Sequence, residues 1–394
     1  MGEKVVIRDS LYGHVEVEEV ALSILDSPQL QRLRRVSQLG FCSLVYPCAN
    51  HTRFEHSLGV YYLASRLSRR LDDISEDELV DFRLACLIHD VGHPPFSHTF
   101  EDILFRYDGL HHTDILKIFG RCEMADILND HGISLKVIED IVHGNGMFGP
   151  LLSSEIDLDR MDYLRRDAYY TGVGYGLVDV EHLLHEIALK NGGVVIGKGG
   201  LHAGESLLIS RFLMYPTVYA HHVPRIAGCM LSYALSEMLE EKELKPNEAR
   251  MMCDWELLES MRGKKIVEDV LRRRLYKRAL FVGLKDVGEN VVEYRGRERR
   301  LAYEIAEEAG IEPENVLVDI PPYPEMEEKR ARIEIAEGEF KQLFELSPLV
   351  RALEKAHIES WRMGVYSPKE YVDRVSKKAK DILGVSSSVQ QTLW

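Results

Sequence analysis

An imidazole and a carboxylate stand next to each other at His89 and Asp90, directly after the apolar run 84–88. An ionised carboxylate at a buried helix end is costly unless a cation or several hydrogen-bond donors meet it. The segment 92–95, Gly-His-Pro-Pro, ends the helix because proline cannot continue the backbone hydrogen-bond ladder. A further histidine, His98, follows. The pattern predicts a charged pair on a rigid support that opens into a histidine-containing loop.

Two other segments carry side chains of the same chemical types. Residues 51–56 (His-Thr-Arg-Phe-Glu-His) lie upstream, and residues 156–163 (Ile-Asp-Leu-Asp-Arg-Met-Asp-Tyr) lie downstream. Together with the doublet they can supply two imidazoles and two carboxylates to one metal ion. Mixed nitrogen and oxygen ligands suit iron, manganese, nickel or zinc far better than calcium. The downstream segment offers three rival carboxylates, Asp157, Asp159 and Asp162.

The spacing of His89 and His93 also matches the metal-binding helix of zinc proteases. That chemistry requires a glutamate after the first histidine as general base, whereas this chain has Asp90. It also requires a continuous helix through the second histidine, where this chain has Gly92 and Pro94. The sequence therefore argues against a zinc protease.

The order of these segments resembles the HD-domain phosphohydrolases, in particular the branch of deoxynucleoside triphosphate triphosphohydrolases found in animals and bacteria. The resemblance extends from about residue 9 to residue 175, and more loosely to about residue 370. It rests on six stretches: 26–34 (DSPQLQRLR), 38–40 (QLG), 53–59 (RFEHSLG), 89–93 (HDVGH), 96–98 (FSH) and 156–163 (IDLDRMDY). The ordered series is specific for the family and less specific for the substrate.

The resemblance implies a metal held by His56, His89, Asp90 and Asp159. It also implies hydrolysis of a deoxynucleoside triphosphate by water attack at the α-phosphorus, which would release a deoxynucleoside and intact triphosphate. A divalent ion lowers the pKa of bound water and polarises a phosphoryl oxygen. Magnesium would accompany the nucleotide.

The resemblance assigns the remaining site residues by their positions in the family's motifs. The implied roles are His98 as general acid oriented by Glu101, His93 and His112 at the α-phosphate, Arg53, Arg160 and Tyr163 on the polyphosphate, Gln38 and Asp167 on the sugar 3′-hydroxyl, and Asp26, Gln31 and Arg34 at an activator nucleotide. The sequence does not decide between His111 and His112. Residues 211–225 correspond to a family segment that contacts phosphates and excludes the ribose 2′-hydroxyl, and the candidates there are Tyr215, Tyr219, His221 and Arg225.

Two other functions stay open. An HD phosphohydrolase with this site could act on ribonucleotides, on monophosphates or on a signalling nucleotide. A nucleotide-binding regulator without turnover is the second alternative. The presence of all four implied metal ligands and of His98 favours an enzyme.

The elements that must position these residues are mostly helices. Apolar spacing predicts helices at about 54–71, 76–90 and 158–168, and the alternation around residues 5–17 predicts a hairpin. The fold class expected is mostly α: an HD-domain helical bundle with an N-terminal hairpin over 1–278, a small α+β lobe over 279–366, and a C-terminal helix and polar tail over 367–394. The strands expected in the lobe are 279–284, 291–294, 316–320 and 331–335.

Composition limits the other function classes. The net charge of −15 over 394 residues argues against general nucleic-acid affinity, although it does not exclude a polyphosphate substrate. Two basic clusters, 272–278 and 295–300, are typical of a solvated face, with an anionic-ligand site as the alternative.

The six cysteines form no disulfide framework, and no targeting or membrane-spanning segment is recognisable, so we expect a cytoplasmic protein. The resemblance implies a homo-oligomer, either a dimer or a tetramer.

Overall fold

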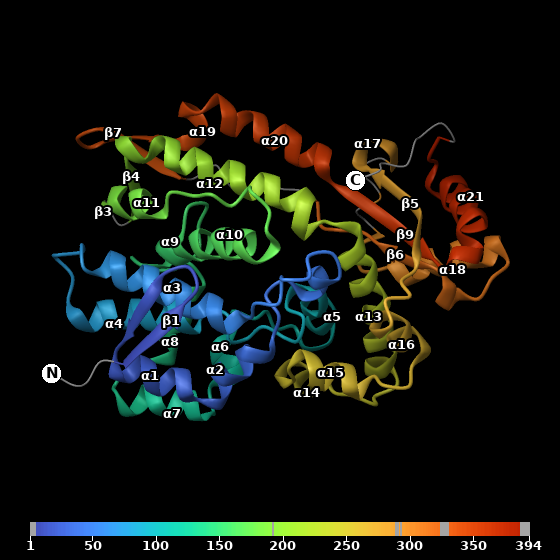
Figure 1. Cartoon of the computed structure of the whole chain (residues 1–394), viewed down its shortest axis with the longest axis horizontal. Helices are drawn as coiled ribbons and strands as arrows, with labels where there is room; N and C mark the ends of the chain where they lie inside the picture. The colour runs from blue at the N-terminus through green and yellow to red at the C-terminus, as the bar shows by residue number, and fades with distance from the viewer. Residues whose placement is uncertain (1–4, 191–192, 288–290, 292–293, 324–330, 387–394) are drawn as a thin grey trace. The chain divides into compact units, whose positions relative to one another are not determined.

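The structure is a computed structural model that describes residues 5–190, 193–287, 291, 294–323 and 331–386 (Figure 1). It is mostly helical, with three small sheets in the described part of the chain, which confirms the predicted fold class. The chain forms two compact units, the first made of residues 1–214, 245–257 and 327–351 and the second of residues 215–244, 258–326 and 352–394. The domain boundaries at 278 and 366 stay a prediction.

The first unit contains the N-terminal hairpin and the helical bundle. Its strands are β1 (Val5–Asp9), β2 (Gly13–Val17), β3 (Ile187–Lys190), β4 (Gly193–Gly197), β7 (Arg332–Ala336) and β8 (Glu339–Gln342). Its helices are α1 (Glu19–Asp26), α2 (Pro28–Arg32), α3 (Arg53–Ser68), α4 (Glu76–Ile88), α5 (His98–Asp108), α6 (Ile115–Phe119), α7 (Glu123–Asp130), α8 (Leu135–Val142), α9 (Gly149–Leu152), α10 (Leu158–Thr171), α11 (Val180–Glu186), α12 (Leu201–Met214), α14 (Pro246–Met251) and α19 (Leu343–Leu346). Strands β1 and β2 pair antiparallel from Val5 and Val17 to Asp9 and Gly13, which confirms the predicted hairpin.

Helix α4 carries the His-Asp doublet on a fully buried support. Phe82 and residues 84–88 have no solvent exposure, so the end of this helix is apolar on all sides, as in a core helix. Helix α3 contacts α4, and α10 contacts α3 (Figure 1). Helix α4 ends at Ile88, so His89 and His93 do not share a continuous helix.

Local sequence fixes where α3 begins and how closely α10 approaches it. Thr52 and Glu55 form a capping box in which the Thr52 backbone N–H donates to Glu55 Oε2 at 2.7 Å. One turn later, a Cβ on Gly59 would lie 2.0 Å from Asp162 Oδ1 of α10. Glycine is therefore required at this position, and the close approach brings α10 within reach of the end of α4.

The four-stranded sheet joins distant parts of the first unit. Its strand order is β3-β4-β7-β8, and β4 and β7 pair in parallel between Val195–Gly197 and Arg332–Glu334. The segment 331–335 was expected as a strand of the same lobe as 279–284, but β7 pairs with β4 of the first unit. A strand's own sequence specifies its buried face but not its partner.

The second unit contains the sheet β5-β9-β6 and the helices that cover it. Its elements are α13 (His222–Glu240), α16 (Lys265–Leu271), β5 (Lys277–Gly283), α17 (Leu284–Val287), α18 (Glu298–Ala309), β6 (Leu317–Asp319), β9 (Arg362–Ser367) and α21 (Val372–Leu383). Helices α15 (Asp254–Ser260) and α20 (Pro348–Ser360) span the two units in sequence. Helices α18 and α21 pack against each other and against the strands, and Trp361 and Met363 lie in the core that they enclose.

Some predictions fall on residues outside the described part of the chain. These are residues 292–293 of the expected strand 291–294 and the polar tail from residue 387. All six cysteines are free thiols, as expected from their spacing. Among the described helices, none combines the length and the apolar character that crossing a membrane requires.

Candidate active site

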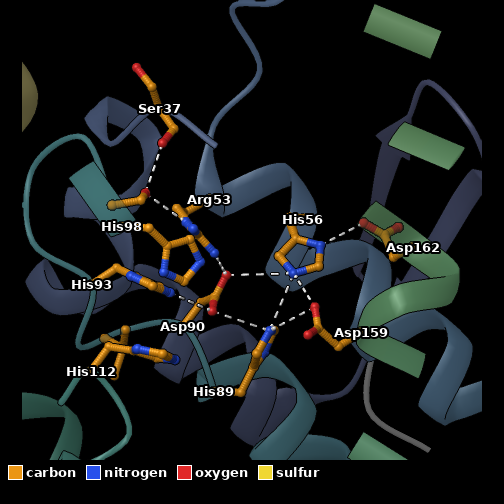
Figure 2. A network of polar contacts seen from close by, with 12 residues as sticks. Ser37, Arg53, His56, His89, Asp90, His93, His98, His112, Asp159 and Asp162 are labelled. Atoms are coloured by element: carbon orange, nitrogen blue, oxygen red, sulfur yellow. Dashed lines mark hydrogen bonds and ion pairs between the residues drawn. The ribbon is translucent and has the colours of Figure 1, made fainter. Parts of the chain in front are cut away.

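Four side chains from neighbouring segments converge at the end of α4 (Figure 2). His56 comes from α3, His89 and Asp90 follow α4, and Asp159 comes from α10. The Nε2 atom of His56 lies 2.9 Å from Asp159 Oδ1 and 3.5 Å from Asp90 Oδ2. The Nε2 atom of His89 lies 3.3 Å from His56 Nε2 and 3.5 Å from Asp90 Oδ1. The structure thus brings together the four residues predicted as metal ligands.

Hydrogen bonds behind the two imidazoles determine which nitrogen faces this cluster. The Nδ1 atom of His56 lies 2.8 Å from Asp162 Oδ2, and the Nδ1 atom of His89 lies 2.8 Å from the carbonyl oxygen of Cys86. Both partners are acceptors, so each Nδ1 donates, and in the neutral imidazole that binds a metal each Nε2 presents its lone pair to the cluster. Two lone pairs that face each other beside two carboxylates fit a divalent transition metal.

The charge around the imidazoles supports the same fit. Burial by itself lowers the pKa of His56, but its hydrogen bonds to Asp159 and Asp162 outweigh burial and raise the pKa to about 10. Burial also opposes protonation of His89, yet the charge of Asp90 raises its pKa. Two buried imidazoles that both favour a positive charge indicate a negative field that a bound cation would neutralise.

The two rival carboxylates of α10 lie in other places. Asp157 caps the helix and accepts from the backbone N–H groups of Ser154 and Arg160, both at 2.7 Å. Its burial raises its pKa to about 7. Asp162 lies behind His56 and does not face the Nε2 atoms. Asp159 is the carboxylate of the three that lies at the cluster.

Asp90 is held by Arg53, which was predicted to bind the polyphosphate. The Nη1 atom of Arg53 lies 2.5 Å from Asp90 Oδ2, and its Nε donates to Ser97 Oγ at 2.9 Å. Both side chains of the ion pair are 5% exposed. In this structure Arg53 orients a candidate metal ligand, and its contact with phosphates stays a prediction.

The loop after the doublet contains two residues with left-handed backbone angles, Phe96 (φ 54°) and Ser97 (φ 53°). Such angles cost about 1–3 kcal/mol each for residues other than glycine. The Phe96 N–H donates to Asp254 Oδ1 at 2.7 Å, and Ser97 Oγ donates to the carbonyl oxygen of Ser37 at 2.9 Å. Asp254 also accepts from the Ser37 N–H at 2.9 Å. Sequence reasoning missed Asp254, which lies far from this loop in the chain and carries no motif.

A buried arginine clamps the turn that carries the doublet. The Nη2 atom of Arg32 donates to the carbonyl oxygens of Val91 and His93, both at 2.8 Å. A Cβ on Gly92 would lie 2.0 Å from the carbonyl oxygen of His112, so this turn also needs glycine. Arg32 belongs to the stretch 26–34 that resembles the family, but no role was predicted for it. Its place between the apolar residues 30 and 33 was a usable signal of an inward-facing side chain.

A histidine cluster continues from Asp90. The Nε2 atom of His93 lies 3.3 Å from Asp90 Oδ1, and its ring stacks on that of His112 at 3.8 Å between centroids. Glu101 of α5 joins His98 and His112, with Nδ1–Oε distances of 3.1 and 2.5 Å respectively. Burial by itself raises the pKa of Glu101, but the hydrogen bonds from His112 and His98 lower it well below its usual range. The predicted general acid therefore has an ionised carboxylate beside it.

The structure also separates the two adjacent histidines that the sequence could not distinguish. His112 lies in the cluster, whereas the ring of His111 stacks on Phe105 at 4.2 Å between centroids.

A second buried polar group surrounds the predicted sugar-reading residues. The Nε2 atom of His51 lies 2.8 Å from Asp167 Oδ1, and both side chains are 2% exposed or less. The Gln38 N–H donates to the carbonyl oxygen of His51 at 3.1 Å. The buried atoms Gln38 Oε1 and His51 Nδ1 have no hydrogen-bond partner among the described residues. No role was predicted for His51, although it begins the histidine-containing segment 51–56.

The predicted polyphosphate residues Arg160 and Tyr163 lie on α10 beside Asp159. The ring of Tyr163 faces that of His56 edge-on at 6.4 Å between centroids. Burial raises the pKa of Tyr163 to about 12, against the opposing charges of Arg160 and Arg211. Arg211 of α12 was not among the candidates chosen from residues 211–225.

The candidates Tyr215, Tyr219, His221 and Arg225 belong to the second unit. There Arg225 pairs with Asp319, with Nε and Nη2 both 2.7 Å from Oδ2. The roles predicted for these four residues stay predictions.

The residues predicted at an activator nucleotide lie at the end of α1 (Asp26), in α2 (Gln31) and directly after α2 (Arg34). Arg34 Nε donates to Gln31 Oε1 at 3.0 Å, and the Arg34 guanidinium lies 3.6 Å from the ring centroid of Phe54. Asp26 and Arg34 are exposed. The role of these three residues as an activator site stays a prediction.

Comparison with known proteins identifies two family regions. Residues 53–167 match the HD domain, and residues 178–394 match the HD associated region. An uncharacterised protein of Methanocaldococcus jannaschii is 35% identical over 397 residues, which cover 96% of this chain and 84% of that protein. The deoxynucleoside triphosphate triphosphohydrolase SAMHD1 homologue of Dictyostelium discoideum is 29% identical and covers 69% of this chain and 59% of its own. The crystal structure of a hypothetical protein from Aquifex aeolicus matches with a TM-score of 0.74 and 30% identity, over 95% of this chain and 100% of that one.

Proposed function

The chain belongs to the HD-domain phosphohydrolase superfamily, and from this premise we propose that it hydrolyses deoxynucleoside triphosphates to deoxynucleoside and triphosphate. The observation that carries the proposal is the convergence of His56, His89, Asp90 and Asp159, in which the Nε2 atoms of both histidines face the two carboxylates. The likeness to the D. discoideum triphosphohydrolase supports a deoxynucleotide as substrate.

The four converging residues would hold iron, manganese, nickel or zinc. Bound there, the ion would lower the pKa of water and polarise a phosphoryl oxygen. The protein's part is orientation: Asp162 and the Cys86 carbonyl keep the two imidazoles in the required tautomer. Arg53 fixes Asp90 in the same way.

Cleavage beside the α-phosphorus requires a proton for the departing 5′-oxygen. His98 is suited to this step because its side chain is 71% exposed and its Nδ1 faces Glu101, which leaves Nε2 to donate. Glu101 is in contact with His98 Nδ1 at 3.1 Å and so orients the ring. His93 and His112 lie between this acid and Asp90, in position for the α-phosphate region. Arg160 and Tyr163 are assigned to the remaining phosphates.

Gln38 and Asp167 are assigned to the sugar 3′-hydroxyl. The unsatisfied Gln38 Oε1 supports this assignment, because a buried acceptor without a partner is costly unless a ligand or a water molecule supplies a donor. His51 holds the second residue of the pair through its contact with Asp167.

Replacing His51 with alanine should raise KM for a deoxynucleoside triphosphate about tenfold or more, since a hydrogen bond to a charged group contributes roughly 1.5–3 kcal/mol. The value of kcat should change much less, because His51 has no contact with the metal-type cluster, which is formed by His56, His89, Asp90 and Asp159. Steady-state kinetics on dGTP and on its 3′-deoxy analogue measures both effects. The variant should also discriminate less between these two substrates.

Exchange of the exposed His131 for glutamine is the control and should alter neither constant. A loss confined to kcat in the His51 variant would contradict the sugar assignment.

The reaction itself is tested by the products and by the position of the new oxygen. Metal-loaded protein is incubated in ¹⁸O-labelled water with dGTP, alone and mixed with the other deoxynucleotides, and separately with GTP, and the products are identified by mass spectrometry. We expect deoxyguanosine and triphosphate with one ¹⁸O in the triphosphate, because attack at the α-phosphorus leaves the water oxygen there. Labelled orthophosphate, or action on ribonucleotides alone, would overturn the substrate and the cleavage position.

The same experiment tests the predicted activator site. Turnover that requires a second nucleotide, and that is lost on exchange of Arg34 for glutamate, would support binding at Asp26, Gln31 and Arg34. Absence of any turnover would favour a nucleotide-binding regulator.

The predicted dimer or tetramer is tested by light scattering with and without nucleotide.

A further inference from the structure

A path of buried ionic contacts leads from His56 to the N-terminal hairpin. His56 Nδ1 donates to Asp162 Oδ2 at 2.8 Å. Arg166 donates to both oxygens of Asp162 at 2.9 Å, through Nε and Nη2. Arg166 Nη1 then donates to Asp9 Oδ2, also at 2.9 Å. The side chains of Asp162 and Arg166 have no exposure and that of Asp9 has 2%, so solvent does not screen the path.

The last residue of this path organises the hairpin turn. The Oδ1 atom of Asp9 accepts from the backbone N–H groups of Leu11 and Tyr12, at 2.8 and 2.9 Å. This is the local turn that an aspartate side chain favours. The Tyr12 ring lies 5.8 Å from the guanidinium carbon of Arg166 and stacks on Tyr62 of α3 at 4.7 Å. One carboxylate therefore serves both partners, with Oδ1 on the hairpin turn and Oδ2 on Arg166.

Stability of the fold alone does not account for this network. Asp9, Arg166 and Asp162 together carry one excess negative charge in a buried position, and such ion clusters are often less stable than apolar replacements. The arrangement is nevertheless tightly fixed, because a Cβ on Gly59 would lie 2.0 Å from Asp162 Oδ1 and 2.5 Å from Arg166 Nη2. A cation bound at His56 Nε2 would lie at one end of this path and would compensate the excess negative charge.

We infer that Asp9 and Arg166 are positioning residues of the metal site, and that docking of the N-terminal hairpin and binding of the metal stabilise each other. Arg166 holds Asp162, and Asp162 holds His56 in the tautomer that presents Nε2. Because coupling between two equilibria is reciprocal, metal binding must in turn stabilise the hairpin. The inference rests on the proposed metal site but not on the identity of the nucleotide.

The first test is the affinity of the metal-free, full-length protein for Mn²⁺, measured by electron paramagnetic resonance of the free ion. Asp9→Asn should weaken binding about tenfold, the lower end of what loss of a supporting contact behind a metal ligand costs. Glu18→Gln is the control, since Glu18 also pairs with an arginine of the same unit, Arg83, at 3.0 and 2.8 Å, directly after β2, although its side chain is more exposed, at 30%. The control should bind Mn²⁺ within about twofold of the unmodified protein, as expected for a change away from the path. Equal affinity of Asp9→Asn and the unmodified protein, or equal loss in both variants, would overturn the inference.

The second test needs no variant. Addition of Mn²⁺ to the unmodified protein should slow amide hydrogen exchange in the hairpin, residues 5–17, and leave the β7–β8 hairpin unchanged. Unchanged exchange in residues 5–17 at saturating Mn²⁺ would contradict the coupling. Both tests are independent of turnover: if no nucleotide is hydrolysed but both effects are seen, the proposed reaction fails and this inference stands. Tight Mn²⁺ binding with neither effect would overturn this inference and would leave the proposed reaction unaffected.

Discussion

Replacing Asp90 with asparagine should abolish nucleotide hydrolysis. The change removes a buried carboxylate from the metal-type cluster and also leaves Arg53 without its partner at Asp90 Oδ2. A catalytic metal contributes several kcal/mol to a phosphoryl-transfer transition state. Since about 1.4 kcal/mol corresponds to a factor of ten in rate, we expect a loss of about 10³-fold or more. The loss should appear in kcat, with less metal per folded chain by elemental mass spectrometry.

A second buried carboxylate–arginine pair supplies the control for this change. Asp108 binds Arg250 through distances of 3.0 and 3.1 Å, with side chains 14% and 2% exposed. Asp108→Asn should cost about 3–5 kcal/mol of unfolding free energy, as breaking a buried pair does. Its activity per folded molecule should stay near that of the unmodified protein. An Asp90→Asn protein that keeps its metal and its rate would disprove the ligand assignment.

Local signals in the sequence located the segments that carry the metal-type cluster, and the family resemblance selected His56, His89, Asp90 and Asp159 within them. The apolar run 84–88 and the following prolines fixed the end of the helix that carries His89 and Asp90, and the structure ends α4 at Ile88. Proline and glycine act on the backbone within a few residues, so their effect is visible in a single sequence. The choice of Asp159 over Asp157 needed the family pattern, because spacing alone placed both near the start of one helix.

The residues that support the cluster could not be predicted in this way. The pairs His51–Asp167 and Asp9–Arg166 join positions 116 and 157 residues apart, and Ser37 and Asp254 are separated by 217 residues. Periodicity reports which face of an element is buried, but it says nothing about which distant element covers that face. The parallel pairing of β4 with β7 escaped prediction for the same reason. Buried polar residues such as Asp162 acquire their role only when the partner, here His56, is known.

Replacing His98 with glutamine should lower kcat by about 10²–10⁴-fold, the usual contribution of a general acid or base. His98 contacts Glu101 and faces His93 edge-on at 4.7 Å between centroids, but it belongs to no contact with His56, His89 or Asp159 in the described structure. The variant should therefore keep its metal, unlike Asp90→Asn. Because product release can mask the chemical step, the rate should be measured in a single turnover by rapid quench.

The adjacent histidines provide the comparison that separates proton donation from a general effect of changing this loop. His111→Gln alters an exposed ring that stacks on Phe105, and we expect a rate within about twofold of the unmodified protein, as for most surface changes. His112→Gln removes a hydrogen bond to Glu101, so it should give an intermediate loss. This order of rates is expected if His98 donates the proton, because His112 acts only through Glu101 and the α-phosphate region to which it is assigned. If His98→Gln and His111→Gln reacted equally fast, the leaving 5′-oxygen would have to obtain its proton from another group.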